Sequence, residues 1–342
     1  MMKSIFLACS VLFAGSLFAE AEEKLKVFIL AGQSNMEGKA KVSLMETQAV
    51  REDTAALYIH LRDGDGEWKV RDDVWIRFLN RSGSLTVGFG SPDRVGPELE
   101  FGNVIGDHFE EPVLLIKTAW GGKSLYRDFR PPSSGLPVAE ILAAQLERAQ
   151  KKKPETTLAE IEASYGHYYR LMLQEVDETL KNLGESFPDL AGREPEIAGL
   201  VWFQGWNDMV NADYVAEYSE HMVNFIRDVR KDLGSPKLPF VIGQLGVGGK
   251  DPSKPNERRD EFKANQAAPA SLPEFRDNVA VVETDQYWDT TAQAVFDKGW
   301  KQNIEAWEAV GSDYPFHYLG SPKTFLGIGR GFGEAMIELL GK

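Results

Sequence analysis

A serine in a sharp turn is the first residue of this sequence that could perform covalent chemistry. The apolar run 27–30 ends in Gly32-Gln33-Ser34-Asn35, a turn that directly follows a predicted buried strand. Open α/β sheets gather their reactive groups at the carboxyl ends of the strands, where a nucleophilic hydroxyl is expected. Serine and asparagine are also preferred helix caps, so on this segment alone Ser34 could equally cap the next helix.

A serine nucleophile needs a base, and His317 is the histidine best placed to serve as one. It lies in the proline-bearing segment 312–320, just before the last predicted helix. Asp313 precedes it by four residues and can orient the imidazole ring and stabilise its charged form. The alternative is an incidental surface aspartate and histidine. The other four histidines are predicted on solvated helix faces or at candidate pocket walls: His108 and His221, and His60 and His167.

Two further polar turns follow predicted strands and offer hydrogen-bond donors. Gly121 and Gly122 come after the run 113–119, and Asn207 comes after the run 197–204. Acyl transfer passes through an oxyanion, which backbone N–H groups near glycine and an asparagine amide can stabilise. Each turn also has a plain structural reading, a tight turn for the glycines and a cap for Asn207.

The order of these turns along the chain resembles the SGNH-hydrolase superfamily. Within it, the sequence is similar to the sialate O-acetylesterase-like carbohydrate esterases, carbohydrate esterase family six and its relatives. The matching blocks are Gly32-Gln33-Ser34-Asn35-Met36, Gly121-Gly122, Gly205-Trp206-Asn207-Asp208 and the segment of His317. The resemblance spans about residues 25–340.

The resemblance implies a role for each of these residues. Ser34 would be the nucleophile and His317 the general base, and the oxyanion hole would combine the Ser34 N–H, an N–H of Gly121 or Gly122, and the Asn207 side chain. The family's acid usually lies three residues before the histidine, where this sequence has Tyr314. Asp313 lies one residue further away, four before His317, and is the expected acid. Two other residues are possible substitutes: Asp285 and Asp289.

Aromatic and amide side chains beside these turns are predicted to bind a sugar. Flat aromatic rings suit the apolar faces of pyranoses, and Trp120 and Trp206 adjoin the site turns. Gln33 and Gln204 are expected to supply polar contacts to the substrate.

The elements that must position these residues alternate between strand and helix patterns. Five short apolar runs predict buried parallel strands: 25–31, 113–119, 197–204, 239–245 and 279–283. Helix-period segments are 98–109, 138–150, 165–183, 213–233 and 324–340. This predicts an α/β fold, a three-layer α/β/α sandwich with a central, mostly parallel five-stranded sheet, which the resemblance identifies as the flavodoxin-like SGNH hydrolase fold. Segment 51–96 is a predicted insertion, with a hairpin pairing 57–62 with 68–70.

Composition limits the partners and the compartment. The chain has 342 residues and a net charge of -14, which disfavours nucleic acid and anionic membranes. Residues 1–21 predict a secretory signal peptide, with Lys3, an apolar core and Ala19-Glu20-Ala21. Its removal takes away the only cysteine, Cys9, and leaves 22–342 as one predicted domain without disulfides. No histidine and carboxylate cluster has metal-ligand spacing, so neither a metal nor a cofactor is expected.

The sequence therefore predicts an exported serine esterase, periplasmic or extracellular, that removes O-acetyl groups from a carbohydrate of sialate or acetylxylan type. The mature protein is expected to bind no nucleic acid and not to insert into membranes. Two alternatives remain open: a general short-chain carboxylesterase or lipase-like enzyme of the same superfamily, and a carbohydrate-binding pseudoenzyme of the same fold. The sugar and the oligomeric state are not defined by the sequence.

Overall fold

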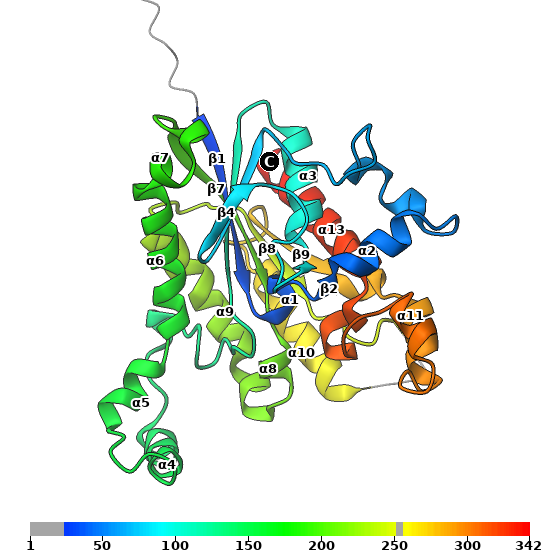
Figure 1. Ribbon diagram of the computed structural model, residues 1–342. Helices are drawn as coiled ribbons and strands as arrows, with labels where there is room; N and C mark the ends of the chain where they lie inside the picture. Colours follow the sequence, from blue (N-terminus) through cyan, green and yellow to red (C-terminus); the bar gives the residue numbers. More distant parts are fainter. Residues whose placement is uncertain (1–23, 251–255) are drawn as a thin grey trace, which may run out of the picture.

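A seven-stranded sheet forms the centre of the computed structural model, which describes residues 24–250 and 256–342 (Figure 1). The predicted signal peptide lies outside the described residues. The strand order is β4-β3-β6-β1-β7-β8-β9. Every neighbouring pair is parallel except β3 and β4, which are antiparallel. The strands are β1 Lys24–Gly32, β3 Val74–Phe78, β4 Arg81–Ser84, β6 Val113–Ala119, β7 Glu194–Phe203, β8 Phe240–Gln244 and β9 Val279–Glu283.

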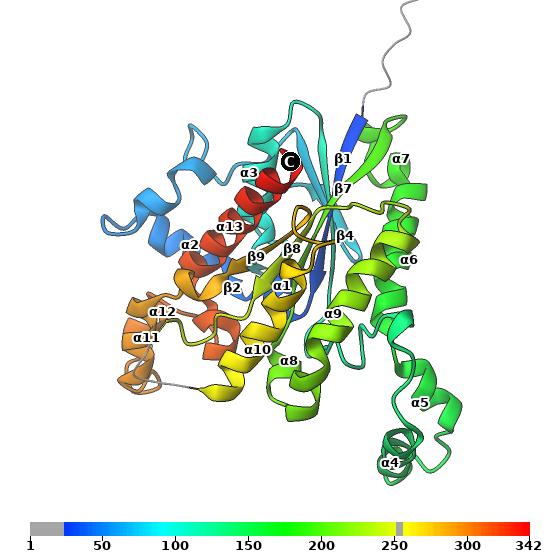
Figure 2. The ribbon, with the colours of Figure 1, turned by 180° about the vertical axis from the view of Figure 1, so that it is seen from behind.

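Helices cover both faces of this sheet, as the opposite views of Figures 1 and 2 show. One core lies between the sheet and helices α3 (Glu98–His108) and α13 (Pro322–Leu340), and the other lies against α6 (His167–Lys181), α9 (Ala212–Asp232) and α10 (Glu257–Ala267). Successive side chains of a strand point to opposite faces, so in β1 Phe28 joins the first core and Ile29 the second. The α/β/α sandwich predicted from the alternation is confirmed.

The remaining elements are short or lie outside the sandwich. They are α1 Ser34–Glu37, β2 Ala40–Lys41, α2 Val42–Ala49, β5 Arg94–Val95, α4 Ala139–Gln150, α5 Leu158–Ser164, α7 Leu183–Ser186, α8 Trp206–Met209, α11 Thr290–Asp297 and α12 Ile304–Glu308. Helices α4 and α5 extend away from the body of the molecule (Figures 1 and 2). Within the described residues, no helix combines the length and the apolarity needed to cross a membrane.

The hairpin predicted within the insertion is not formed. Segment 57–62 does not pair as a strand: it forms short 3-10 turns, Ala55–Leu57 and Ile59–Leu61, with a single bridge from Arg62 to Trp68. The antiparallel pair lies further along, where β3 and β4 join the sheet beside β6. The sheet therefore has seven strands rather than five.

The register of the sheet brings the candidate site turns to one edge. Gly32 at the end of β1 pairs with Ala119 at the end of β6 and with Phe203 at the end of β7. The turns that follow these three parallel strands carry Ser34, the glycine pair and Asn207. They meet at the carboxyl edge of the sheet.

Candidate active site

The turn that presents Ser34 depends on a glycine. A Cβ on Gly32 would lie 2.1 Å from the carbonyl oxygen of Phe203, so no larger residue fits between β1 and β7 here. The N–H of Gln33 donates to the same carbonyl at 3.3 Å. The chain then bends directly into α1, whose first residue is Ser34.

Ser34, His317 and Asp313 form a continuous chain of hydrogen bonds. The Ser34 Oγ lies 3.0 Å from His317 Nε2, and His317 Nδ1 lies 3.0 Å from Asp313 Oδ1. Asp313 and His317 sit on one irregular turn, in which Tyr318 and Leu319 adopt left-handed backbone angles with φ of 51° and 61°. This turn accommodates the four-residue spacing that departs from the family pattern.

Asp313 is held ionised by its neighbours. Burial opposes ionisation, but the hydrogen bonds from His317 and from the Tyr314 N–H, together with the Arg94 charge, lower the pKa of its carboxyl group. Arg94 Nη1 lies 2.8 Å from Asp313 Oδ2.

The two substitute acids make other contacts. Asp285 pairs with Lys263 at 2.5 Å, and Asp289 caps α11 and accepts a hydrogen bond from Ser321 Oγ at 2.7 Å. The structure thus brings Asp313, and neither substitute, to the imidazole.

The candidate oxyanion donors differ in whether they already donate a hydrogen bond to another protein group. The Gly121 N–H donates to Glu37 Oε1 at 2.6 Å, whereas the Gly122 N–H makes no hydrogen bond within the described part of the chain. The Asn207 side chain, half-buried in α8, is likewise without a partner among the described residues. Gly122 and Asn207 can therefore donate to a ligand, and Gly121 is already engaged.

Glu37 is a site residue that the sequence reasoning missed. Its other carboxylate oxygen accepts from Lys39 Nζ at 2.6 Å and from Ser91 Oγ at 3.2 Å. Burial opposes ionisation of Glu37, but Lys39, the Gly121 N–H and Ser91 lower its pKa. Its position three residues after Ser34 was the only sequence signal, because its partners come from distant segments.

A buried ion pair lies beneath α1 and was also missed. Lys117 Nζ donates to Glu98 Oε2 at 2.8 Å and to the carbonyl oxygen of Glu37 at 2.7 Å, and both charged side chains are fully buried. Burial lowers the pKa of Lys117, and the Glu98 carboxylate opposes that effect. The pair fixes the last turn of the helix that begins at Ser34.

Gln33 and Gln204, which the sequence predicts to contact the substrate, are engaged with protein groups in this structure. Both are almost completely buried, and Gln204 Nε2 donates to Gln33 Oε1 at 3.1 Å and to Asp208 Oδ2 at 2.5 Å. They join the first and third blocks to each other. Asp208 also accepts from the N–H groups of Leu125 and Tyr126, both at 2.9 Å, and burial raises its pKa to about 7 against these hydrogen bonds.

The two predicted tryptophans remain partly exposed. Trp206 packs against Phe316 with ring centroids 5.6 Å apart, and Trp120 packs edge-on against Tyr168 at 5.2 Å. Phe316 in turn contacts the ring of His317 at 4.5 Å. Trp206 is thus part of an aromatic cluster that includes the candidate base.

The predicted environment of one histidine outside the site is wrong. His221 is buried rather than solvated: Arg130 Nη1 lies 2.8 Å from its Nε2, and Ser134 Oγ lies 3.1 Å from its Nδ1. His108 is exposed as predicted, and His60 lines a separate cavity and pairs with Glu100. In the described ranges no group of three or more histidine, cysteine, aspartate or glutamate side chains is arranged to hold a metal ion.

A Ser–His–Asp chain of hydrogen bonds at the carboxyl edge of an α/β/α sandwich is the arrangement typical of serine hydrolases. A family described as carbohydrate esterase, sialic acid-specific acetylesterase, matches residues 24–298. The chain belongs to this family, which confirms the resemblance read from the sequence and makes the protein a carboxylic ester hydrolase of the acetylesterase type. Asp313 and His317 lie beyond the matched residues, so their assignment rests on geometry.

Individual relatives are more distant. A protein of Arabidopsis thaliana named as a probable carbohydrate esterase is 22% identical over 224 residues, which cover 66% of this chain and 70% of the relative. The crystal structure of an Arabidopsis thaliana protein superposes with a TM-score of 0.51 at 16% identity, over 91% of this chain and 97% of that one. A carbohydrate acetylesterase of Xanthomonas citri gives a TM-score of 0.48 at 15% identity, over 90% and 55%.

Proposed function

We propose that the protein is an exported serine esterase that removes O-acetyl groups from a carbohydrate through an acyl-enzyme. The observation that carries this proposal is the unbroken hydrogen-bond chain from Ser34 through His317 to Asp313 in a chain of the carbohydrate esterase family. A sialate or an acetylated xylan is the substrate type that the sequence favours.

Each step of the proposed reaction uses a group at the site. Ser34 Oγ attacks the acetyl carbonyl while His317 Nε2 takes its proton, and the tetrahedral intermediate then expels the sugar hydroxyl, which receives that proton. Water, deprotonated by His317, attacks the acetyl-serine; acetate leaves, and His317 returns the proton to Ser34 Oγ. Asp313 holds the ring and stabilises its charge. The oxyanion is stabilised by the N–H groups of Ser34 and Gly122 and by the amide of Asn207.

The test is hydrolysis of p-nitrophenyl acetate by the mature protein and its Ser34→Ala variant. We expect Ser34→Ala to lose about 10⁴-fold or more in kcat, because removing the nucleophile leaves only oxyanion stabilisation and binding. Ser43→Ala, at an exposed serine of α2, is the matched control and should retain wild-type activity. Full activity in a folded Ser34→Ala protein would rule out the mechanism.

Two alternatives are separated by substrate. Faster hydrolysis of p-nitrophenyl butyrate than of acetate, with no acetate released from acetylated glycans, would indicate a general carboxylesterase. Binding of a glycan without hydrolysis of any ester would indicate a pseudoenzyme.

Amino-terminal sequencing of the exported protein tests the predicted cleavage after Ala21.

A further inference from the structure

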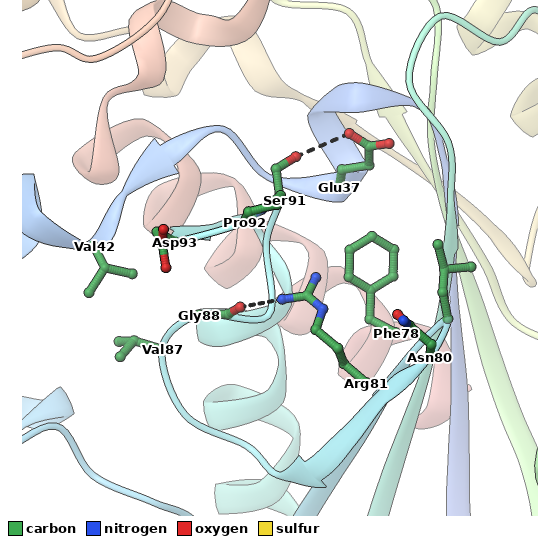
Figure 3. Close-up of a pocket in the computed structure, with 11 residues that line it drawn as sticks. Glu37, Val42, Phe78, Asn80, Arg81, Val87, Gly88, Ser91, Pro92 and Asp93 are labelled. Carbon is green, nitrogen blue, oxygen red and sulfur yellow. Dashed lines mark hydrogen bonds between the residues drawn. The ribbon is translucent and has the colours of Figure 1, made fainter.

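A cavity of about 750 Å³ lies beside the turn that follows β3, at the carboxyl edge of the sheet, and Figure 3 shows residues that line it. Leu79 and Asn80 in the turn after β3 form one wall, and residues 91–93 form another. β3 runs parallel to β6, which runs parallel to β1, so this turn opens at the edge that carries Ser34. Its volume falls within the range of about 300–1,000 Å³ typical of ligand sites.

The walls combine apolar surface with two charged side chains that have no ionic partner among the described residues. In Figure 3 the Arg81 guanidinium lies between the Phe78 ring and the Gly88 carbonyl, to which it donates at 2.7 Å. Within the described chain no carboxylate pairs with Arg81, and the Asp93 carboxylate accepts no hydrogen bond. Val42 and Val87 supply the apolar part. A ligand with both hydroxyl groups and an apolar face would satisfy these walls.

The backbone of two wall residues is held in a costly conformation. Leu79 and Asp93 have φ of 53° and 57°, and they are two of the four non-glycine residues with positive φ among those described. Leucine tolerates this region poorly, and such strain persists mainly where the surroundings impose it, as at ligand-binding sites. The strain marks both walls of the same cavity.

The cavity wall is connected to the candidate catalytic residues on two sides. Ser91 donates to Glu37, whose other oxygen accepts from the Gly121 N–H. Arg94, next to Asp93, pairs with Asp313. A ligand that orders residues 91–94 would therefore steady both the oxyanion loop and the acid.

We propose that this cavity is a carbohydrate subsite that binds a neutral pyranose unit next to the acetylated one. Arg81, which donates to the carbonyls of Gly88 and Gly90, and Asp93 present one positive and one negative charge without an ionic partner in the part of the chain that the structure describes. The Glu37 charge is paired with Lys39, so the walls favour hydroxyl groups over an ionic ligand. The substrate is then an O-acetylated oligo- or polysaccharide rather than a free acetylated monosaccharide. This inference rests on the proposed function.

The experiment compares kcat/KM for acetylated tetrasaccharides with that for the corresponding acetylated monosaccharides, in xylose, glucose and mannose series, with p-nitrophenyl acetate as reference. The variants are the double change Asn80→Ala/Asp93→Asn and the single change Val87→Trp, which fills the cavity. The double change removes the Asn80 amide and the Asp93 charge, and asparagine at 93 reaches positive φ more readily than most residues. Matched controls at exposed positions are Asp65→Asn and Val50→Trp.

In the wild type we expect at least one tetrasaccharide to exceed its monosaccharide in kcat/KM. Both cavity variants should lower the ratio of kcat/KM for the tetrasaccharide to kcat/KM for the monosaccharide by about 10-fold, the loss expected for one or two hydrogen bonds to the sugar. The controls should leave it unchanged. Equal ratios in wild type across all three series, or ratios that both cavity variants leave unchanged, would overturn the subsite. Failure of the wild type to hydrolyse any of these esters would instead overturn the proposed function.

Discussion

Asp313 occupies a position in which its charge has two uses. It accepts from His317 Nδ1, and it pairs with Arg94, whose guanidinium also donates to the Lys39 carbonyl at 2.6 Å. Arg94 therefore fixes the carboxylate from the side opposite the imidazole. A carboxylate held at both ends can set the tautomer of the base without moving toward it.

Replacing Asp313 by asparagine should reduce kcat for p-nitrophenyl acetate by about 10⁴-fold, because an amide at this position favours the wrong imidazole tautomer. Asp285→Asn is the matched control, since Asp285 is also ion-paired but its partner is Lys263. Stopped-flow or steady-state release of p-nitrophenol measures both. If Asp285→Asn loses the activity and Asp313→Asn keeps it, the acid has been assigned wrongly.

Glu37 is expected to act as a positioning residue through Gly121. Glu37→Gln keeps an acceptor for the Gly121 N–H but loses the charge paired with Lys39, while Glu37→Ala loses both. We expect kcat to fall by about 100-fold in Glu37→Ala, comparable to the loss of an oxyanion donor, with KM little changed. Glu37→Gln should recover most of this loss.

Glu46→Ala, at an exposed position of α2, controls for loss of a surface carboxylate. Equal effects of the alanine and glutamine variants, or an effect on KM alone, would argue against the positioning role.

At the scale of elements, helix α9 holds the long segment that follows the glycine pair. His221 on α9 contacts Arg130, and Asp228, about two turns further along, accepts from the Ser133 N–H at 2.8 Å. Asp208 binds the same segment at Leu125 and Tyr126. These polar contacts hold the segment that follows the glycine pair against the core on the α9 side of the sheet.

His221 makes the stability of this arrangement depend on pH. Burial first, and then the Arg130 charge, lower its pKa to about 3, against 6.5 for the ordinary group. The unfolded chain binds the proton more readily between these values, so stability is complete above pH 6.5 and falls as the pH decreases toward 3. From pH 7 to pH 5 the loss from this residue is about 2 kcal/mol.

His221→Gln should therefore lose less stability than the wild type over this interval, as urea unfolding at pH 7 and pH 5 would measure. The matched control is His108→Gln, at an exposed histidine, and its loss of stability between pH 7 and pH 5 should equal that of the wild type. A wild-type-like decrease in His221→Gln would show that another group causes the pH dependence.

The elements differ in how far the sequence could reveal them. The continuous apolar runs of the five parallel strands, buried on both faces, were predictable, and so were the long amphipathic helices such as α9. β3 and β4 were not, because β4 reads Arg-Ser-Gly-Ser and owes its strand conformation to pairing with β3.

Ser34 and Asn207 were found by their place after strands. Glu37 and Lys117 were not, since their roles depend on contacts across 84 and 19 positions of the chain.

At the scale of the whole molecule, the acidic surface should influence which esters reach the site. The net charge of -14 repels anionic substrates over roughly one Debye length, about 10 Å at 0.1 M salt. Two cationic side chains act in the opposite direction: Arg81 in the β3-side cavity and Lys123, which directly follows Gly122. Salt weakens both effects, so the sign of the salt dependence identifies the dominant one.

We expect kcat/KM for an acetylated sugar that carries a carboxylate to rise by about 2-fold or more between 0.02 M and 0.5 M NaCl, because screening removes the net repulsion. The same measurement on a neutral acetylated sugar should change little and serves as the control for general effects of salt. A decrease for the anionic ester would mean that the local cations exceed the overall charge at the cleft. In that case an acidic sugar such as a sialate becomes the favoured substrate type, and the neutral pyranose proposed for the β3-side cavity would have to lie beside an anionic one.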